Sequence, residues 1–171
     1  MKHTFIQQVT ATEQGSIENR LTMAFSQEAG TLTIDAITDY NHDTVENDKV
    51  NITLDASAVA RFGTALLEWY ELATEDVEFG YFKAIFPSEV IKEAQGDPEI
   101  ATKHSYIVVT NQIFGSRIDF TAGETNTGMD DLVSDTGIVS WHLTPEFVDE
   151  LTKHIAEFLI LHMVKGAVID E

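Results

Sequence analysis

The stretch VNITLDASAVARFGTALLEWYELAT, residues 50–74, decides the fold because its pattern returns as VSWHLTPEFVDELTKHIAEFLILHM, residues 139–163. The two stretches align without a gap when the first is moved by 89 positions, from 50 to 139. Seven apolar positions then coincide: Val50 with Val139, Ile52 with Trp141, Leu54 with Leu143, Val59 with Val148, Phe62 with Leu151, Leu66 with Ile155, and Trp69 with Phe158. The chain therefore contains an internal repeat in which an alternating strand leads into an amphipathic helix.

Each copy changes from strand to helix at a residue that suits a helix N-terminus. Asp55 and Thr144 can accept a hydrogen bond from the first free helical amides. Pro145 follows in the second copy, at the first helical position, where the missing amide costs nothing. The apolar residues of the first helix step by three and four, and they are Val59, Phe62, Leu66, Trp69 and Ala73. We expect two long helices that each present one apolar stripe to a core, the second of about twenty residues.

Several alternating runs precede each helix and predict strands with a period of two. In the first half they lie at residues 5–9, 21–25, 32–36 and 50–54, with a polar loop at 39–49. In the second half they lie at 77–86, 106–110, 113–121 and 138–143, with Asn111-Gln112 as a turn and a long polar loop at 123–137. Pro87 stops the first of these runs, and residues 88–95 predict a short inserted helix.

In each half of the chain, the strands come first and the helix comes last. This order of elements is typical of an α+β fold and not of an α/β fold, in which strands and helices alternate. We therefore predict two pseudo-repeated units, each of about four antiparallel strands followed by one long helix. The first unit spans residues 1–75 and the second 76–171, and the two are expected to share one globular core.

The composition restricts the class of protein. Hydrophobic residues make up 43% and charged residues 23% of the chain, which favours a folded domain over disorder. There is no cysteine, which excludes disulfides, thiolate metal sites and cysteine nucleophiles. No run is apolar enough for a signal peptide or a membrane span, so we expect a cytoplasmic protein with no membrane partner. The 29 acidic and 10 basic residues give a net charge of −19, which favours basic partners or simply solubility.

The duplicated four-strand-plus-helix plan resembles the Whirly group, a fold of single-stranded-DNA-binding transcriptional regulators. The resemblance covers most of the chain and is carried by the topology and by the two strand–helix junctions, Leu54-Asp55 and Leu143-Thr144. It implies nucleic-acid binding through basic and aromatic residues on a sheet. The sequence departs from this pattern because its expected strands hold few cations and no family binding motif is matched residue by residue.

The binding candidates that follow are the cations and aromatic residues of the expected strands. Of Tyr81 and Phe82, which point to opposite faces of a strand, whichever faces outward beside Lys83 is the best candidate. The full set of nucleic-acid-binding candidates is Arg20, Tyr81, Phe82, Lys83, Lys103 and Arg117. The net charge supports the alternative of an acidic protein-interaction module that occupies a basic surface, as a nucleic-acid mimic would. Both alternatives are non-enzymatic.

Catalytic and metal-binding signatures are absent from the sequence. There is no G-x-S-x-G, no Walker loop and no H-E-x-x-H. Asp39, Asn41 and Asp43 open like a calcium loop, but Thr44 stands where that loop needs glycine. Glu150, His154 and Glu157 share one helix face and are interpreted as surface residues rather than as metal ligands. We predict no catalytic residue, no metal site and no cofactor.

The end of the second helix indicates a contact with another chain. Residues 158–164 are apolar on nearly all sides of the helix. A helix with this pattern is normally buried against another surface. We expect a homo-oligomer, a dimer or higher. The interface candidates are Phe158, Leu159, Leu161, His162 and Met163.

Overall fold

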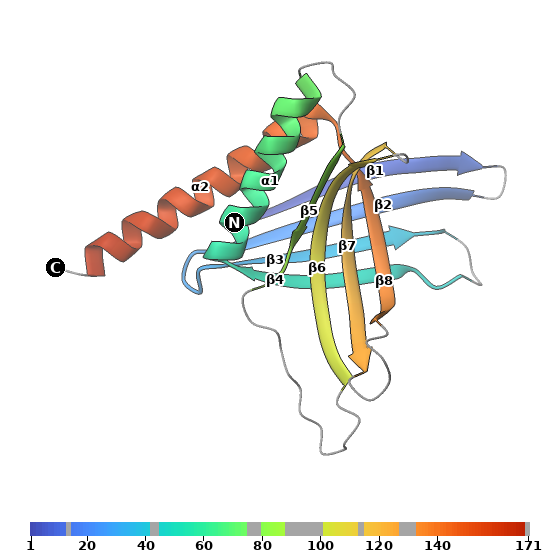
Figure 1. The fold of residues 1–171 in the computed structure, drawn as a ribbon, viewed down its shortest axis with the longest axis horizontal. Coiled ribbons are helices and arrows are strands. Elements are labelled where there is room, and N and C mark those ends of the chain that lie inside the picture. The colour runs from blue at the N-terminus through green and yellow to red at the C-terminus, as the bar shows by residue number, and fades with distance from the viewer. Residues whose placement is uncertain are drawn as a thin grey trace.

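The computed structural model describes residues 1–12, 15–41, 45–74, 80–87, 101–112, 115–126 and 133–169. They form two antiparallel four-stranded sheets, each followed by one helix (Figure 1). Sheet A has the order β1 (Lys2–Thr12), β2 (Gly15–Ser26), β3 (Thr31–Asp39) and β4 (Asp48–Asp55), and leads into α1 (Ala56–Thr74). Sheet B has the order β5 (Tyr81–Ile85), β6 (Ala101–Gln112), β7 (Gly115–Asn126) and β8 (Val133–His142), and leads into α2 (Pro145–Ile169).

This architecture confirms the predicted α+β fold of two pseudo-repeated units. All seven pairs of equivalent apolar positions in the repeat are buried. The burial also alternates along β3, as a strand with one face on the core requires. The repeat in the sequence is therefore a repeat of core-forming positions.

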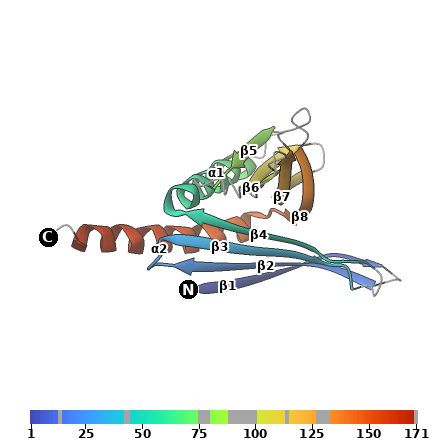
Figure 2. The ribbon, with the colours of Figure 1, turned by 90° about the horizontal axis from the view of Figure 1, so that it is seen from below.

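The strands of the two sheets run across one another, and the two helices lie side by side (Figure 1). From below, α2 lies along sheet A, whereas α1 lies toward sheet B (Figure 2). The buried side chains of both sheets and both helices form one hydrophobic cluster. Close contact between the helices is possible because a Cβ atom on Gly63 of α1 would lie only 3.0 Å from Ile155 Cγ2 of α2. The two units thus share one core.

Both helices begin at the capping residues that the sequence indicates. The backbone N–H of Ala58 donates to Asp55 Oδ1 at 2.7 Å, and that of Phe147 donates to Thr144 Oγ1 at 3.3 Å. The second helix continues to Ile169 and is 25 residues long, longer than the expected twenty. Its C-terminal part extends beyond the sheets (Figure 2).

The edge strand β8 of sheet B is bound by polar side chains of sheet A. Gln7 Nε2 donates to the carbonyl oxygen of His142 at 3.0 Å, and the N–H of His142 donates to Gln7 Oε1 at 2.9 Å. Asn19 Nδ2 donates to the carbonyl oxygen of Ser140 at 2.5 Å and its Oδ1 accepts from Thr38 Oγ1 at 2.9 Å. A strand edge carries unpaired backbone groups, and these bonds satisfy three of them on β8 without a further strand.

Some predicted boundaries are wrong. Asn111 and Gln112 belong to β6, and the hairpin turns two residues later, where Gln112 pairs with Gly115. Gly115 has φ of +90°, a conformation that a side chain disfavours, and this allows the late turn. β4 begins at Asp48, within the expected polar loop. β7 continues to Asn126 and β8 begins at Val133, so both strands include part of the expected loop at 123–137. The predicted inserted helix at 88–95 lies outside the described residues.

Candidate binding surface

The outer face of sheet B is the side turned away from the core. Strand alternation places Ile107, Val109, Ile118, Phe120, Val139 and Trp141 on the core side. The residues between them lie on the opposite side of the sheet, where Val108, Thr110 and Thr121 are themselves buried, and register brings them into rows across the sheet. We define the outer face of sheet B by Phe82, Ala84, Phe86, Tyr106, Val108, Thr110, Arg117, Asp119, Thr121, Ile138, Ser140 and His142.

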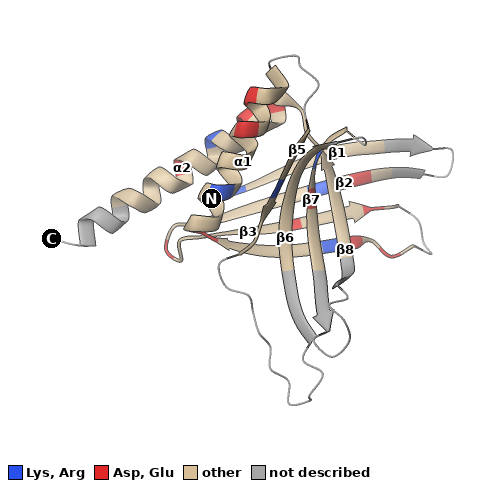
Figure 3. Ribbon diagram, in the orientation of Figure 1, with Lys and Arg blue, Asp and Glu red and all other residues tan. Residues whose placement is uncertain are grey.

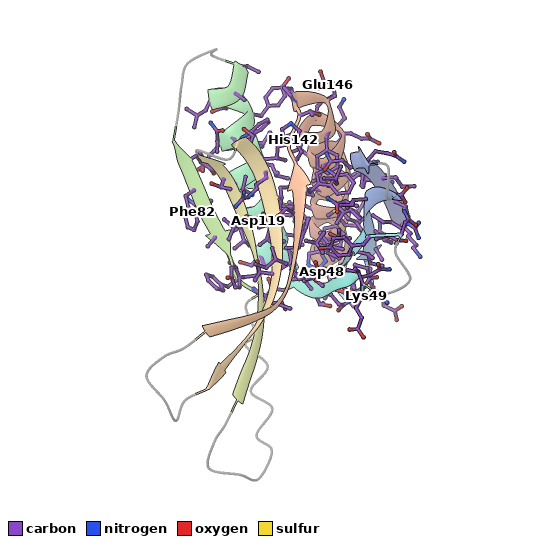
Figure 4. The ribbon with its side chains drawn as sticks, turned by 90° about the vertical axis from the view of Figure 1, so that its right-hand side faces the viewer. Asp48, Lys49, Phe82, Asp119, His142 and Glu146 are labelled. Carbon is purple, nitrogen blue, oxygen red and sulfur yellow. The ribbon has the colours of Figure 1, made fainter. Side chains whose placement is uncertain are left out.

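Exposed aromatic and aliphatic side chains are the main feature of this face. Phe82 is 60% exposed, Phe86 52% and Ile138 44%. The ring centroids of Phe86 and Tyr106 lie 5.4 Å apart, which joins them into one aromatic platform. Phe82 stands on the edge strand β5 (Figure 4), and the row of Ala84 separates it from Phe86 along the same face. Large exposed apolar groups gathered on one face are typical of a binding surface.

The polar part of the same face is a hydrogen-bonded group on β7 and β8. Arg117 Nε donates to Asp119 Oδ2 at 2.9 Å, and Ser140 Oγ donates to Asp119 Oδ1 at 2.6 Å. Register places Arg117 beside His142 and in the row of Phe82. Figure 4 shows Asp119 and His142 on the strands next to one another. The Arg117 guanidinium is a planar cation with several N–H donors, a type of group that recognises anionic ligands.

Tyr81 and Phe82 differ as strand alternation requires, and Phe82 is the one that faces outward. Tyr81 lies on the helix side of β5, where its hydroxyl donates to Glu68 Oε2 at 2.7 Å and contacts the carbonyl oxygen of Ala65 at 3.1 Å. Burial and the Glu68 hydrogen bond raise the pKa of Tyr81. Lys83 is on that same side, with Nζ 3.9 Å from Glu68 Oε2. Tyr81 and Lys83 thus attach β5 to α1 and are not part of the outer face of sheet B.

The predicted cations do not gather on one face. Arg20 lies on the outer side of sheet A, where its Nη2 is 3.2 Å from Glu18 Oε1. Arg117 lies on sheet B beside Asp119, and Lys103 belongs to β6 with its side chain outside the described part of the chain. Figure 3 shows Lys and Arg distributed over several elements. Of the predicted set, the structure brings only Phe82 and Arg117 together on the outer face of sheet B.

Two contributors to this face were missed as site residues, Phe86 and Ile138. Phe86 follows Phe82 by four positions on an extended strand, and this even spacing was the available signal for a shared face. Ile138 carried no such signal. It is exposed and its neighbour Val139 is buried, but the sequence alone cannot tell which of two adjacent apolar residues on a strand faces the core.

The interface candidates on α2 fall into two groups. Phe158 is fully buried and packs on Phe25 with ring centroids 5.3 Å apart, so it belongs to the core of its own chain. Leu159 is half-buried, and the half-buried His162 ring stacks against Phe158 at 6.1 Å. Leu161 and Met163 are exposed, and so are two neighbours that the prediction did not include, Ile160 and Val164. The exposed group lies where α2 extends past the sheets (Figure 1).

Other kinds of site find no support in the described residues. No group of three or more His, Asp and Glu side chains there is placed to hold a metal ion. The opening of the calcium-like loop instead makes a local turn, in which Asn41 N–H donates to Asp39 Oδ1 at 2.9 Å. None of the helices in the described ranges is long and apolar enough to cross a membrane.

Comparison with known proteins does not assign a family. A scan against protein-family models finds no match, and a search of curated proteins finds none either.

Proposed function

We propose that this chain is a non-enzymatic binding protein that binds single-stranded nucleic acid on the outer face of sheet B. The observation that carries the proposal is the exposure of Phe82 and Phe86 on a sheet face that also holds Arg117. Bases stack on exposed aromatic rings in a way that tolerates any sequence, and each stacked base contributes about 1–3 kcal/mol.

The aromatic groups and the arginine suit different parts of an extended single-stranded nucleic acid. Phe82 offers one stacking ring, and the Phe86–Tyr106 pair offers a second on the same face. Arg117 shares its charge with Asp119, which holds the guanidinium on this face, and a guanidinium is a group that suits contact with a phosphate. Stacking therefore supplies most of the proposed affinity, because the acidic chain has few cations to contribute.

This division of roles sets the expected salt dependence. Binding that neutralises many phosphates weakens steeply with salt, with a slope of about −0.7 per phosphate for single strands. With one arginine on the face, we expect a slope of about −0.7 and affinity in the micromolar range at low salt.

The test is fluorescence anisotropy of a labelled oligothymidylate at low and at moderate salt, with the intact chain. Phe82→Ser should weaken binding about tenfold or more, since one stacking ring is lost. Leu67→Ser is the matched control, because Leu67 is 52% exposed but lies on α1, away from this face. An absence of binding at low salt, or equal losses in both variants, would refute the nucleic-acid proposal.

The second candidate is the acidic protein-interaction module, and the ion pairs favour it. Arg20, Lys83 and Arg117 each have a carboxylate within 4 Å, so little uncompensated positive charge remains on these elements. A basic protein or peptide would then be the partner, and its affinity would fall with salt. Titrating labelled polylysine against the same two variants distinguishes the candidates, since this binding would not depend on Phe82.

We also propose that the chain forms a homo-oligomer through the exposed apolar group on α2. The support is the exposure of Ile160, Met163 and Val164 together, with no acidic residue between positions 158 and 169. Sedimentation equilibrium tests this, and Met163→Glu should shift the mass to that of a single chain.

A further inference from the structure

The N-terminal strand is joined to the last helix by a pair of stacked histidines. The rings of His3 on β1 and His154 on α2 lie with centroids 3.5 Å apart and planes inclined by 26°. His3 pairs with Met23 of β2, a fully buried residue, so its side chain lies on the inner side of sheet A. Two imidazoles thus form a direct contact between elements that lie at opposite ends of the sequence.

The surroundings of His3 suit a neutral ring. Its Nε2 atom is buried and has no hydrogen-bond partner among the described residues. The ring also meets Phe25 edge-on with centroids 6.1 Å apart. A proton added at Nε2 would place a charged N–H against apolar surface with no acceptor to bind it.

The charged and titratable groups around His3 come from α2 and from the chain terminus. On α2 they are His154, Glu150 and Glu157, and before β1 it is the N-terminal ammonium of Met1, which donates to the carbonyl oxygen of Phe25 at 2.9 Å. From β2 the neighbour is the uncharged Phe25 ring. The two carboxylates are exposed on the helix surface, so water screens their attraction.

These groups act on the pKa of His3 in opposite directions, and the effects that lower it are the larger ones. Burial lowers the pKa of His3 below its ordinary value of 6.5, and positive charge on His154 and on the terminal ammonium lowers it further. Glu157 and Glu150 act to raise this pKa. The neutral form is therefore the one that the folded contact prefers.

We propose that the His3–His154 stack is a pH-sensitive latch that holds β1 against α2 while the His3 ring is neutral and releases it when that ring is protonated. Protonation would place a charge on a ring whose centroid lies 3.5 Å from that of His154, and whose buried nitrogen has no acceptor among the described residues. The strand it releases is the edge of sheet A, and the same strand carries Gln7, which binds β8. Acidification thus loosens the contact between the two sheets as well.

The sign follows from proton linkage. A histidine that stays neutral in the folded protein binds protons more readily when the strand is released. The latch is complete above pH 6.5, the ordinary pKa of His3, and weakens as the pH falls below it toward the lowered value.

The test is amide hydrogen exchange of the intact chain at about pH 7.5 and about pH 5, a range that brackets histidine titration. The wild type is compared with the double variant His3→Gln/His154→Gln at each pH, so that the intrinsic exchange rates cancel. The quantity measured is the change in β1 protection between the two pH values, which also cancels any loss of packing in the variant. His142→Gln is the control, because His142 is exposed and engages Gln7 only through its backbone.

We expect β1 of the wild type and of the control to lose protection about tenfold more on acidification than β1 of the double variant, because only the wild type and the control keep the histidine pair. Amides of β3 should change equally in all three proteins. A β1 pH response that is the same in the wild type and the double variant would overturn the latch. So would a His3 titration at or above 6.5 in the NMR spectrum of the wild type, because the folded contact would then not prefer the neutral ring.

Discussion

Replacing Asn19 by alanine tests whether side chains rather than strand pairing hold the two sheets together. Asn19 is 4% exposed, and its amide joins the carbonyl oxygen of Ser140 in sheet B to the hydroxyl of Thr38 in sheet A. Asn19→Ala removes both hydrogen bonds and leaves the buried Thr38 hydroxyl and the part-buried carbonyl oxygen of Ser140 without this partner. A buried polar group left unsatisfied costs about 1–3 kcal/mol, so the free energy of unfolding should fall by about 3 kcal/mol.

The assay is urea unfolding followed by tryptophan fluorescence, since Trp69 and Trp141 are both buried in the shared core. In a chain of this size, 1 kcal/mol corresponds to about 2–4 °C, so thermal unfolding should shift by about 6–12 °C. Asn51→Ala is the matched control, because Asn51 is an exposed asparagine whose side chain donates to Asp35 on the outer side of sheet A. We expect this control to lose less than about 1 kcal/mol. Equal losses in the two variants would refute the role given to Asn19.

Three further changes test the core, the turn and the cap. Phe62→Ala should reduce the free energy of unfolding by about 3–5 kcal/mol, measured by urea midpoint, because the ring is fully buried between the units. Gly30→Ala should cost about 2 kcal/mol by thermal unfolding, since φ is +65° and the new Cβ would lie 2.6 Å from His162 Cε1. In a His162→Ala background only about half of that cost should remain, and an unchanged cost would contradict the contact. Asp55→Ala should lose about 1 kcal/mol of helix capping in the same assay, whereas Asp55→Asn should retain most of it.

The sequence was sufficient for the elements whose signal is local and periodic. The seven equivalent pairs and the caps at Asp55 and Thr144 predicted both strand–helix junctions, because burial imposes a period of two on a strand and near 3.6 on a helix. The same periodicity separated Tyr81 from Phe82 but could not tell which of them faces the core, since both sides of a strand that carries apolar residues look alike.

Features that depend on distant partners could not be predicted. Gln7 and His142 lie 135 positions apart, and a glutamine in an edge strand carries no sign that it will bind another sheet. The polar ends of β7 and β8 read as loop because their stability comes from pairing with each other and not from side-chain pattern. The placement of Arg20 and Arg117 on different sheets likewise follows from packing and register rather than from local sequence.

The single hydrophobic cluster shared by the two units has a consequence for dissecting this chain. A fragment that ends with α1 would expose Phe62, Leu66 and Trp69, which the intact chain buries, and the remaining fragment would expose Ile155 and Phe158 in the same way. Neither half should therefore fold in isolation, yet the two halves carry complementary surfaces. Produced together as separate polypeptides, they should reassemble, and the dissociation constant of that complex would report how strongly the two units stabilise each other.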